Sequence, residues 1–289
     1  MVNEFPQVLT IAGSDSDGSA GMQADLHTFF IRKTYGMSVL VAVVAGNSYG
    51  IHAAETLPLH FVDKQFEVLA DDFKVRASKT GMLSDASLIE AVVKAYKQFD
   101  FGPLVVDPVI TTKHGAQLLE AAAFEALKEK LLPLATVATP NFFEAQLLTG
   151  RTIDNEQQQT AAAKDIQSLG VQNVIVKGWH NQDNQNEVAD YVLLADGFDF
   201  WLRHPYFDTT HINGTGDTLS AAIAAEIAKG KDVATAIRIA HDVTATAIEH
   251  EIAVGHKFGP INHWAAQDYN KKKTNSLSSF YYDAPVISP

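Results

Sequence analysis

The chain contains no cysteine among its 289 residues. This absence excludes disulfide bonds, thiolate zinc sites, iron–sulfur clusters and cysteine nucleophiles. Apolar runs are short as well, because none reaches the roughly 18 residues that a transmembrane helix needs. No basic-then-apolar leader opens the chain. We therefore expect a cytoplasmic protein.

Positive charge is also scarce. The chain carries 22 Lys and Arg against 34 Asp and Glu, which gives a net charge of -12. Nucleic acid and anionic membrane surfaces would repel such a chain, so we expect neither as a partner. We expect a single α/β domain over residues 1–266. The Lys- and Ser-rich segment 267–289, which ends in prolines, is typical of a flexible tail.

Short β-branched runs alternate with amphipathic stretches along the chain. Strands are predicted over residues 8–12, 39–44, 104–107, 137–139 and 174–176. Helices are predicted over residues 24–32, 118–132 and 142–148, from Asp217 onward, and over 233–250. Continuous apolar strands separated by helices indicate a mostly parallel sheet covered by helices on both faces. Residues 190–194 and 198–202 flank Gly197 and predict a hairpin at the sheet edge.

Ligands bind beyond the carboxyl ends of the strands in an open parallel sheet. The loops expected to matter are 13–21, 46–50, 108–115, 140–144 and 177–180. Most of the chain's unusual polar residues and glycines lie in these loops, and this agreement between separate segments supports a site there.

The segment from Asn213 to Ser220 is the most informative part of the chain. Gly214, Thr215 and Gly216 are followed by Asp217, and a helical pattern begins at once. Glycines allow a phosphate to approach the backbone, and a helix start offers free N–H groups and positive dipole charge. Asp217 beside such an anion site could take a proton from an attacking hydroxyl. The alternative is that Asp217 is only the N-cap of the helix.

Other polar residues follow separate strands. Asn141 and Glu144 are spaced to share one face of a helix start, where they could serve Mg²⁺ and its waters, or could form a capping box. Lys177 ends a strand and could reach a nucleotide phosphate, or could be an ordinary surface lysine. Asp107 also ends a strand, a position used for metal-linked contacts. Asp25, early in the first helix, is either a surface residue or a ligand contact.

Seven motifs occur in an order that resembles the ribokinase-like superfamily, in its vitamin-kinase branch of pyridoxal/pyridoxine kinases and hydroxymethylpyrimidine (phosphate) kinases. The resemblance runs from about Val8 to Trp264. The motifs are Ile11-Ala12-Gly13-Ser14-Asp15, Gln23-Ala24-Asp25, Lys79-Thr80-Gly81-Met82-Leu83, Val106-Asp107-Pro108-Val109, Thr139-Pro140-Asn141-x-x-Glu144-Ala145, Val176-Lys177-Gly178 and Gly214-Thr215-Gly216-Asp217-Thr218-Leu219-Ser220-Ala221-Ala222.

The resemblance implies a three-layer ribokinase-like sandwich and the phosphorylation of a hydroxymethyl group on a small heteroaromatic ring. It implies ATP and Mg²⁺, with a monovalent cation such as K⁺ as a further candidate. Asp217 would be the base, and Gly214, Thr215 and Gly216 would form the anion hole. The implied sites for ATP are Asn141, Glu144, Lys177, Thr210, Gly216 and Val243; for the substrate, Gly13, Ser14, Asp25, Gly46, Met82 and Val109; and for Mg²⁺, Asp107 and Glu144, partly through water. Residues 111–115 would act as a flap.

Two departures from the family bear on the substrate. Close bacterial relatives that serve both vitamins commonly carry Cys where this chain has Asp217. Pyrimidine kinases usually carry Gln at the position of Gly46, where it pairs with the aminopyrimidine edge, and losing such a partner costs on the order of 1–3 kcal/mol. We therefore expect vitamin B6 (pyridoxal, pyridoxine and pyridoxamine) as substrate. The alternatives are a hydroxymethylpyrimidine kinase and a non-catalytic vitamin- or nucleotide-binding module. The resemblance also suggests a homodimer, with the hairpin near residues 190–202 or the early strands at its interface.

Overall fold

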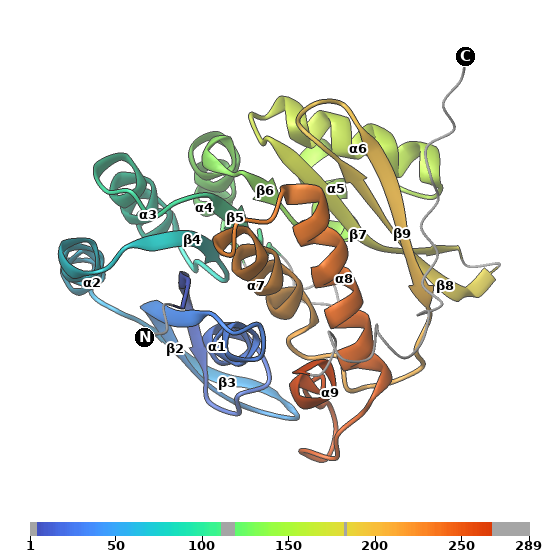
Figure 1. Cartoon of the computed structure of the whole chain (residues 1–289), viewed down its shortest axis with the longest axis horizontal. Helices are drawn as coiled ribbons and strands as arrows, with labels where there is room; N and C mark the ends of the chain where they lie inside the picture. Colours follow the sequence, from blue (N-terminus) through green and yellow to red (C-terminus); the bar gives the residue numbers. More distant parts are fainter. Residues whose placement is uncertain (1–4, 111–118, 182–183, 268–289) are drawn as a thin grey trace.

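A nine-stranded sheet forms the centre of the protein (Figure 1). The computed structural model describes residues 5–110, 119–181 and 184–267. The strands lie in the order β3-β2-β1-β4-β5-β6-β7-β8-β9. They are β1 (Gln7–Asp15), β2 (Tyr35–Asn47), β3 (Gly50–Thr56), β4 (Val75–Thr80), β5 (Leu104–Val106), β6 (Val137–Ala138), β7 (Asn173–Asn181), β8 (Asn184–Leu193) and β9 (Asp199–Pro205).

Strands β2, β1, β4, β5, β6 and β7 run parallel to one another, whereas β3, β8 and β9 pair antiparallel with their neighbours. The strand order changes direction at β1, which lies between β2 and β4. In open α/β sheets, ligands bind at such a switch point, outside the carboxyl ends of the strands. The topology thus singles out the ends of β1 and β4.

Helices cover both faces of this sheet. They are α1 (Gly21–Ile31), α2 (Leu59–Asp72), α3 (Ala86–Gln98), α4 (Ala121–Ala126), the π-helix η1 (Leu127–Leu131), the 3₁₀-helix η2 (Leu132–Leu134), α5 (Phe142–Thr149), α6 (Glu156–Ser168), α7 (Thr215–Ala228), α8 (Val233–Glu249) and α9 (His263–Gln267). Alternate strand residues face opposite layers: Val106 and Val174 pack with α2 to α6, while Val105 and Ile175 pack with α1, α7 and α8. The expected three-layer α/β sandwich is confirmed.

The predicted apolar strands are all present, and so is the hairpin of β8 and β9. Residues 46–50, expected as a loop of the site, connect β2 to the antiparallel strand β3. The expected helix over 118–132 is divided into α4, η1 and the first residue of η2, with Leu118 outside the described residues. β1 also runs beyond its expected end to Asp15, with an irregularity in its pairing with β2 between Ala12 and Ser14.

The domain boundary expected at residue 266 stays a prediction. Helix α9 ends at Gln267, and residues 268–289 of the expected tail lie outside the described residues. Among the residues that the structure describes, no helix is both long and apolar enough to span a bilayer.

Candidate active site

The start of helix α7 is the centre of the candidate site. Its N-cap is Gly214, whose φ of 81° is in the left-handed region that favours glycine. The N–H of Thr215 donates to the carbonyl of Ile212 at 3.3 Å. The N–H groups of Gly216 and Asp217 have no acceptor inside the helix, so they are the donors that an anion would meet. Asp217 is the third residue of the helix, and the alternative of an Asp217 N-cap is therefore wrong.

Asp107, Lys177 and Gly216 come together from three separate elements. The Nζ of Lys177, in β7, lies 3.3 Å from Oδ1 of Asp107, which directly follows β5. A Cβ on Gly216 would lie 3.2 Å from Oδ2 of Asp107 and 3.4 Å from Nζ of Lys177. Because Gly216 has no side chain, the Asp107 carboxylate and the Lys177 ammonium lie close to the backbone at the start of α7. An ammonium beside free N–H groups is suited to phosphate, as expected for Lys177.

Asn141 and Glu144 form a capping box at the start of α5. The N–H of Glu144 donates to Oδ1 of Asn141 at 2.9 Å, and the N–H of Asn141 donates to Oε2 of Glu144 at 2.9 Å. Oε1 of Glu144 accepts from the N–H of Ile110 at 3.0 Å. Burial, strengthened by the charge of Asp107, raises the pKa of Glu144 to about 7. Each oxygen of Glu144 thus already accepts one backbone hydrogen bond, which suits a contact to a metal through water.

The donor set fits Mg²⁺ in one respect. Within the described ranges, no group of three or more His, Asp or Glu side chains could hold a metal ion by itself. Mg²⁺, however, is often bound by one or two carboxylates together with substrate phosphates and waters. Asp107 supplies such a carboxylate beside the helix start.

Several expected substrate residues meet at the ends of β1 and β4. A Cβ on Gly13 would lie 2.9 Å from Cε of Met82, so these two residues are in close contact. The Oγ of Ser14 accepts a 2.7 Å hydrogen bond from Gln23, which fixes this loop to α1. Val109 has a φ of 43°, a strained conformation for a β-branched residue. Such strain is found disproportionately at functional sites.

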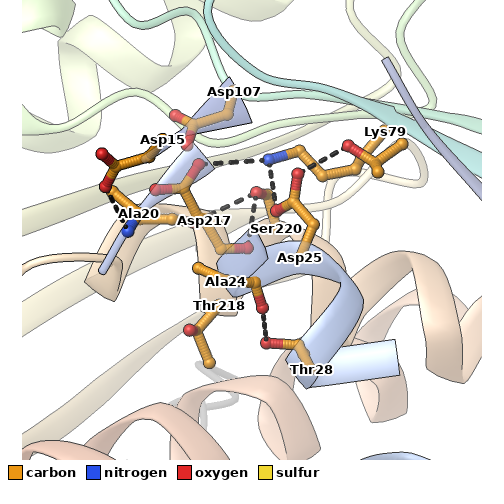
Figure 2. Close-up of polar contacts among 12 residues, drawn as sticks. Asp15, Ala20, Ala24, Asp25, Thr28, Lys79, Asp107, Asp217, Thr218 and Ser220 are labelled. Carbon is orange, nitrogen blue, oxygen red and sulfur yellow. Dashed lines mark hydrogen bonds and ion pairs between the residues drawn. The ribbon is translucent and has the colours of Figure 1, made fainter. Parts of the chain in front are cut away.

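Asp25 lies below the site and not at its surface. Its Oδ1 accepts from Nζ of Lys79 at 2.8 Å, and its Oδ2 accepts from Oγ1 of Thr10 at 2.5 Å. Both Asp25 and Lys79 have 0% exposed side chains. Figure 2 shows the Lys79 ammonium between Asp25 and Asp217, and its Nζ lies 3.5 Å from Oδ1 of Asp217. A direct substrate contact by Asp25 stays a prediction.

The sequence reasoning gave Lys79 no role, although Lys79 lies in one of the quoted motifs. The signal that could have revealed it is similar to the one that drew attention to Lys177: a lysine near the carboxyl end of a strand, with a glycine shortly after it. What the sequence does not contain is the identity of the partners, since Asp25 and Asp217 lie far from Lys79 in the chain.

Other expected contacts are not brought to the same place. Val243 is 0% exposed and packs in a core cluster with Ile31 and Ile261, so its expected ATP contact has no support here. Thr210 is exposed, and its carbonyl accepts from the N–H of Gly259. Of the expected flap, residues 111–115 lie outside the described residues.

Gly46 lies in β2, close to the hairpin turn. Its N–H donates to Oγ of Ser16, and its carbonyl accepts from the same hydroxyl, both at 2.8 Å. A Cβ on Gly46 would lie 3.8 Å from Oδ1 of Asp15. The Asp15 carboxylate therefore lies beside Gly46, the position at which pyrimidine kinases usually carry glutamine. A carboxylate oxygen there could accept from the amino group of the pyrimidine, which weakens our argument against a pyrimidine substrate.

Known proteins are similar to this chain in sequence and in fold. The phosphomethylpyrimidine kinase family matches residues 15–262. The chain belongs to this family. A hydroxymethylpyrimidine/phosphomethylpyrimidine kinase of Haemophilus influenzae is 47% identical over 265 residues, covering 91% of this chain and 98% of the relative. The family is one of small-molecule kinases, as the motifs led us to expect.

Two solved pyridoxal kinases are close in structure. An ADP complex of the Bacillus subtilis enzyme has a TM-score of 0.83 and 35% identity, covering 91% of this chain and 98% of that one. The Staphylococcus aureus enzyme in complex with AMP-PCP and pyridoxal has a TM-score of 0.83 and 32% identity, covering 97% and 98%. The name of the Haemophilus influenzae relative therefore favours the pyrimidine alternative over our expectation of vitamin B6 as substrate. The two pyridoxal kinases have the same fold, so the fold alone does not distinguish the two substrates.

Proposed function

We propose that this protein is an ATP-dependent hydroxymethylpyrimidine/phosphomethylpyrimidine kinase. The observation that carries the proposal is the match over 98% of the Haemophilus influenzae kinase. The geometry supports it, because the start of α7 offers an anion site with Asp217 beside it and Lys177 close to Gly216. The adenine-nucleotide complexes of the two pyridoxal kinases support ATP as the phosphoryl donor.

In this proposal, the substrate's hydroxymethyl oxygen attacks the γ-phosphorus of ATP in line with the leaving group. Asp217 takes the hydroxyl proton as general base. The N–H groups of Gly216 and Asp217 hold the transferring phosphoryl group, and Lys177 contacts the same phosphate. The substrate ring would lie at the ends of β1 and β4, where Gly13 and Met82 are in contact.

Asp107 would hold Mg²⁺ together with phosphate oxygens, and Glu144 would order the surrounding waters. When bound, such an ion neutralises charge on the phosphates. A requirement for K⁺ stays an untested prediction.

Substrate choice is tested by measuring ADP release in parallel on hydroxymethylpyrimidine and on pyridoxal. We expect kcat/KM at least tenfold higher for the pyrimidine, which corresponds to about 1.4 kcal/mol of transition-state discrimination. The variant Gly46→Gln is expected to raise this ratio further, because a side-chain amide adds a hydrogen bond to the amino edge. Gly46→Ala, which places the same Cβ 3.2 Å from the carbonyl oxygen of Gly50 but adds no amide, is the matched control.

The second candidate is a pyridoxal kinase. Gly46 favours it, since the sequence lacks the glutamine that usually reads the pyrimidine, and so do the two structural neighbours. A higher kcat/KM for pyridoxal in the same assay would establish this candidate and reject the pyrimidine. If the protein consumes ATP neither with hydroxymethylpyrimidine nor with pyridoxal, both candidate functions are rejected.

We also propose that the protein is cytoplasmic and forms a homodimer through strand β3. Within the part of the chain that the structure describes, this edge strand pairs only with β2, and its seven residues are all exposed, including Ile51 at 62%. Exposed edge strands readily pair with another chain. We expect a mass in solution of twice the chain mass, and a shift toward monomer for Ile51→Lys. Light scattering after gel filtration measures both, and Leu147→Lys, at an exposed position of α5 (48%), is the control.

A further inference from the structure

Lys79 is a fully buried cation directly behind the proposed base. It is on β4, its side chain is 0% exposed, and it bridges two carboxylates from different helices (Figure 2). Asp25, in α1, holds it at 2.8 Å, and Asp217, in α7, lies 3.5 Å away. Of these three side chains, only Asp217 reaches the surface, with 17% exposed. The ammonium therefore contacts Asp217 from the protein side and leaves the ligand side open.

The backbone keeps this arrangement tight. A Cβ on Gly81 would lie 3.1 Å from Cβ of Ala12, 3.3 Å from Nζ of Lys79 and 3.8 Å from Oδ1 of Asp217. The glycine two residues after Lys79 thus lets β4 approach β1 and α7 closely enough for the ammonium to reach both carboxylates. Oγ1 of Thr10, in β1, completes the hydrogen bonding of Asp25.

The carboxylates near Lys79 outnumber its single positive charge. Burial alone would lower the pKa of Lys79, yet the carboxylates of Asp25, Asp217 and Asp107 raise it, so the ammonium stays charged. Burial raises the pKa of Asp25 to about 7, against the attraction of Lys79 and with a further upward contribution from Asp217. His263, in α9, also interacts with Asp217, and burial together with His27 lowers the pKa of His263 to about 4, so it is neutral near pH 7. Lys79 is thus the buried cation in contact with Asp217.

We propose that Lys79 is a positioning residue for phosphoryl transfer: its ammonium, anchored by Asp25, attracts the Asp217 carboxylate and orients it toward the acceptor hydroxyl. This inference rests on the proposed function, in which Asp217 is the base. A carboxylate can accept the hydroxyl proton only while it is ionised. Without the ammonium, Asp217 would lose its contact with the buried cation, and the loss of a nearby opposite charge disfavours the ionised form of a carboxylate.

The test is the pH dependence of kcat and kcat/KM for Lys79→Met, with ATP and hydroxymethylpyrimidine or pyridoxal, whichever the wild type prefers. We expect kcat at pH 7 to fall at least tenfold and the acidic limb of kcat/KM to move up by about one pH unit, the scale of a single lost ion pair. KM for ATP should change less than about twofold, because nothing in the phosphate site is removed. The same limb should be absent in Asp217→Asn, which assigns it to Asp217.

A purely structural ion pair gives a different result. Arg32 and Glu226 form another buried pair, between α1 and α7, with an Nη2–Oε1 distance of 2.6 Å and side chains 3% and 1% exposed. Arg32→Met is therefore the matched control, which should lower Tm and leave the acidic limb in place. A Lys79→Met profile with an unmoved limb, and with activity that follows only the folded fraction, would overturn the proposal.

A second comparison covers the case in which Lys79→Met does not fold. The double variant Lys79→Met/Asp25→Asn removes both partners of the pair, so neither leaves an uncompensated charge, a change that proteins tolerate better than the loss of one partner. Its acidic limb should lie above that of Asp25→Asn alone, and equal limbs would overturn the proposal. The wild type separates the two hypotheses: if it phosphorylates neither vitamin precursor, the proposed function fails before any Lys79 variant is compared.

Discussion

Asp217→Asn should lower kcat on the preferred substrate by a hundredfold or more, about 2.7 kcal/mol of transition-state stabilisation. The asparagine has nearly the same shape as the aspartate, but its amide cannot accept the hydroxyl proton. The start of α7, Lys177 and Asp107 are unchanged, so ATP should bind with a Kd close to that of the wild type. Single-turnover kinetics and calorimetric titration with a non-hydrolysable ATP analogue measure these two quantities separately.

The control for this substitution is Asp196→Asn, at an exposed loop position before β9. It has the same chemistry as Asp217→Asn and should leave kcat unchanged. Near-normal turnover of Asp217→Asn would remove the general base from the mechanism. Loss of ATP binding together with turnover would instead show that the side chain shapes the phosphate site, and the role of base would then lack its support.

The sheet could be predicted wherever burial on both faces makes a strand uniformly apolar. This holds for β5 and for the centres of β1, β2 and β7. Strand β3 escaped prediction because all of its residues are exposed, so it carries no continuous apolar run of the kind that marks a buried strand. Strand β4 escaped for the opposite reason, since it buries the polar residues Ser78, Lys79 and Thr80. Those polar residues are buried because β4 lies at the switch point of the sheet, which only the strand order reveals.

The site was predictable where a residue's role follows from its own segment. The glycine-rich helix start and the capping box of Asn141 and Glu144 are local, and both are where the sequence places them. Contacts that depend on the topology were not predictable. Asp25 binds Lys79 beneath the site, where a direct substrate contact stays a prediction, and Val243 packs in the core. In both cases the residue's helix was foreseen and the direction of its side chain was not.

Gly214→Ala should lower kcat by at least tenfold and also destabilise the fold. A Cβ at this position would lie 2.4 Å from the carbonyl oxygen of Ser19, a backbone atom that cannot move without shifting the loop between β1 and α1. The substitution also places alanine at a φ of 81°, which by itself costs about 1 kcal/mol. The start of α7 must then move, and with it the N–H groups proposed to hold the phosphoryl group.

Gly230→Ala tests the backbone strain without displacing the helix start, because Gly230 lies just beyond the other end of α7. Its φ of 83° matches that of Gly214, yet a Cβ there meets nothing within 4 Å. Gly230→Ala should therefore lose about 1 kcal/mol of unfolding free energy with kcat unchanged. Urea unfolding and ADP release on both variants complete the comparison. If Gly214→Ala lost only the stability that Gly230→Ala loses and kept its kcat, the close approach of Gly214 to Ser19 would have no part in holding the anion site.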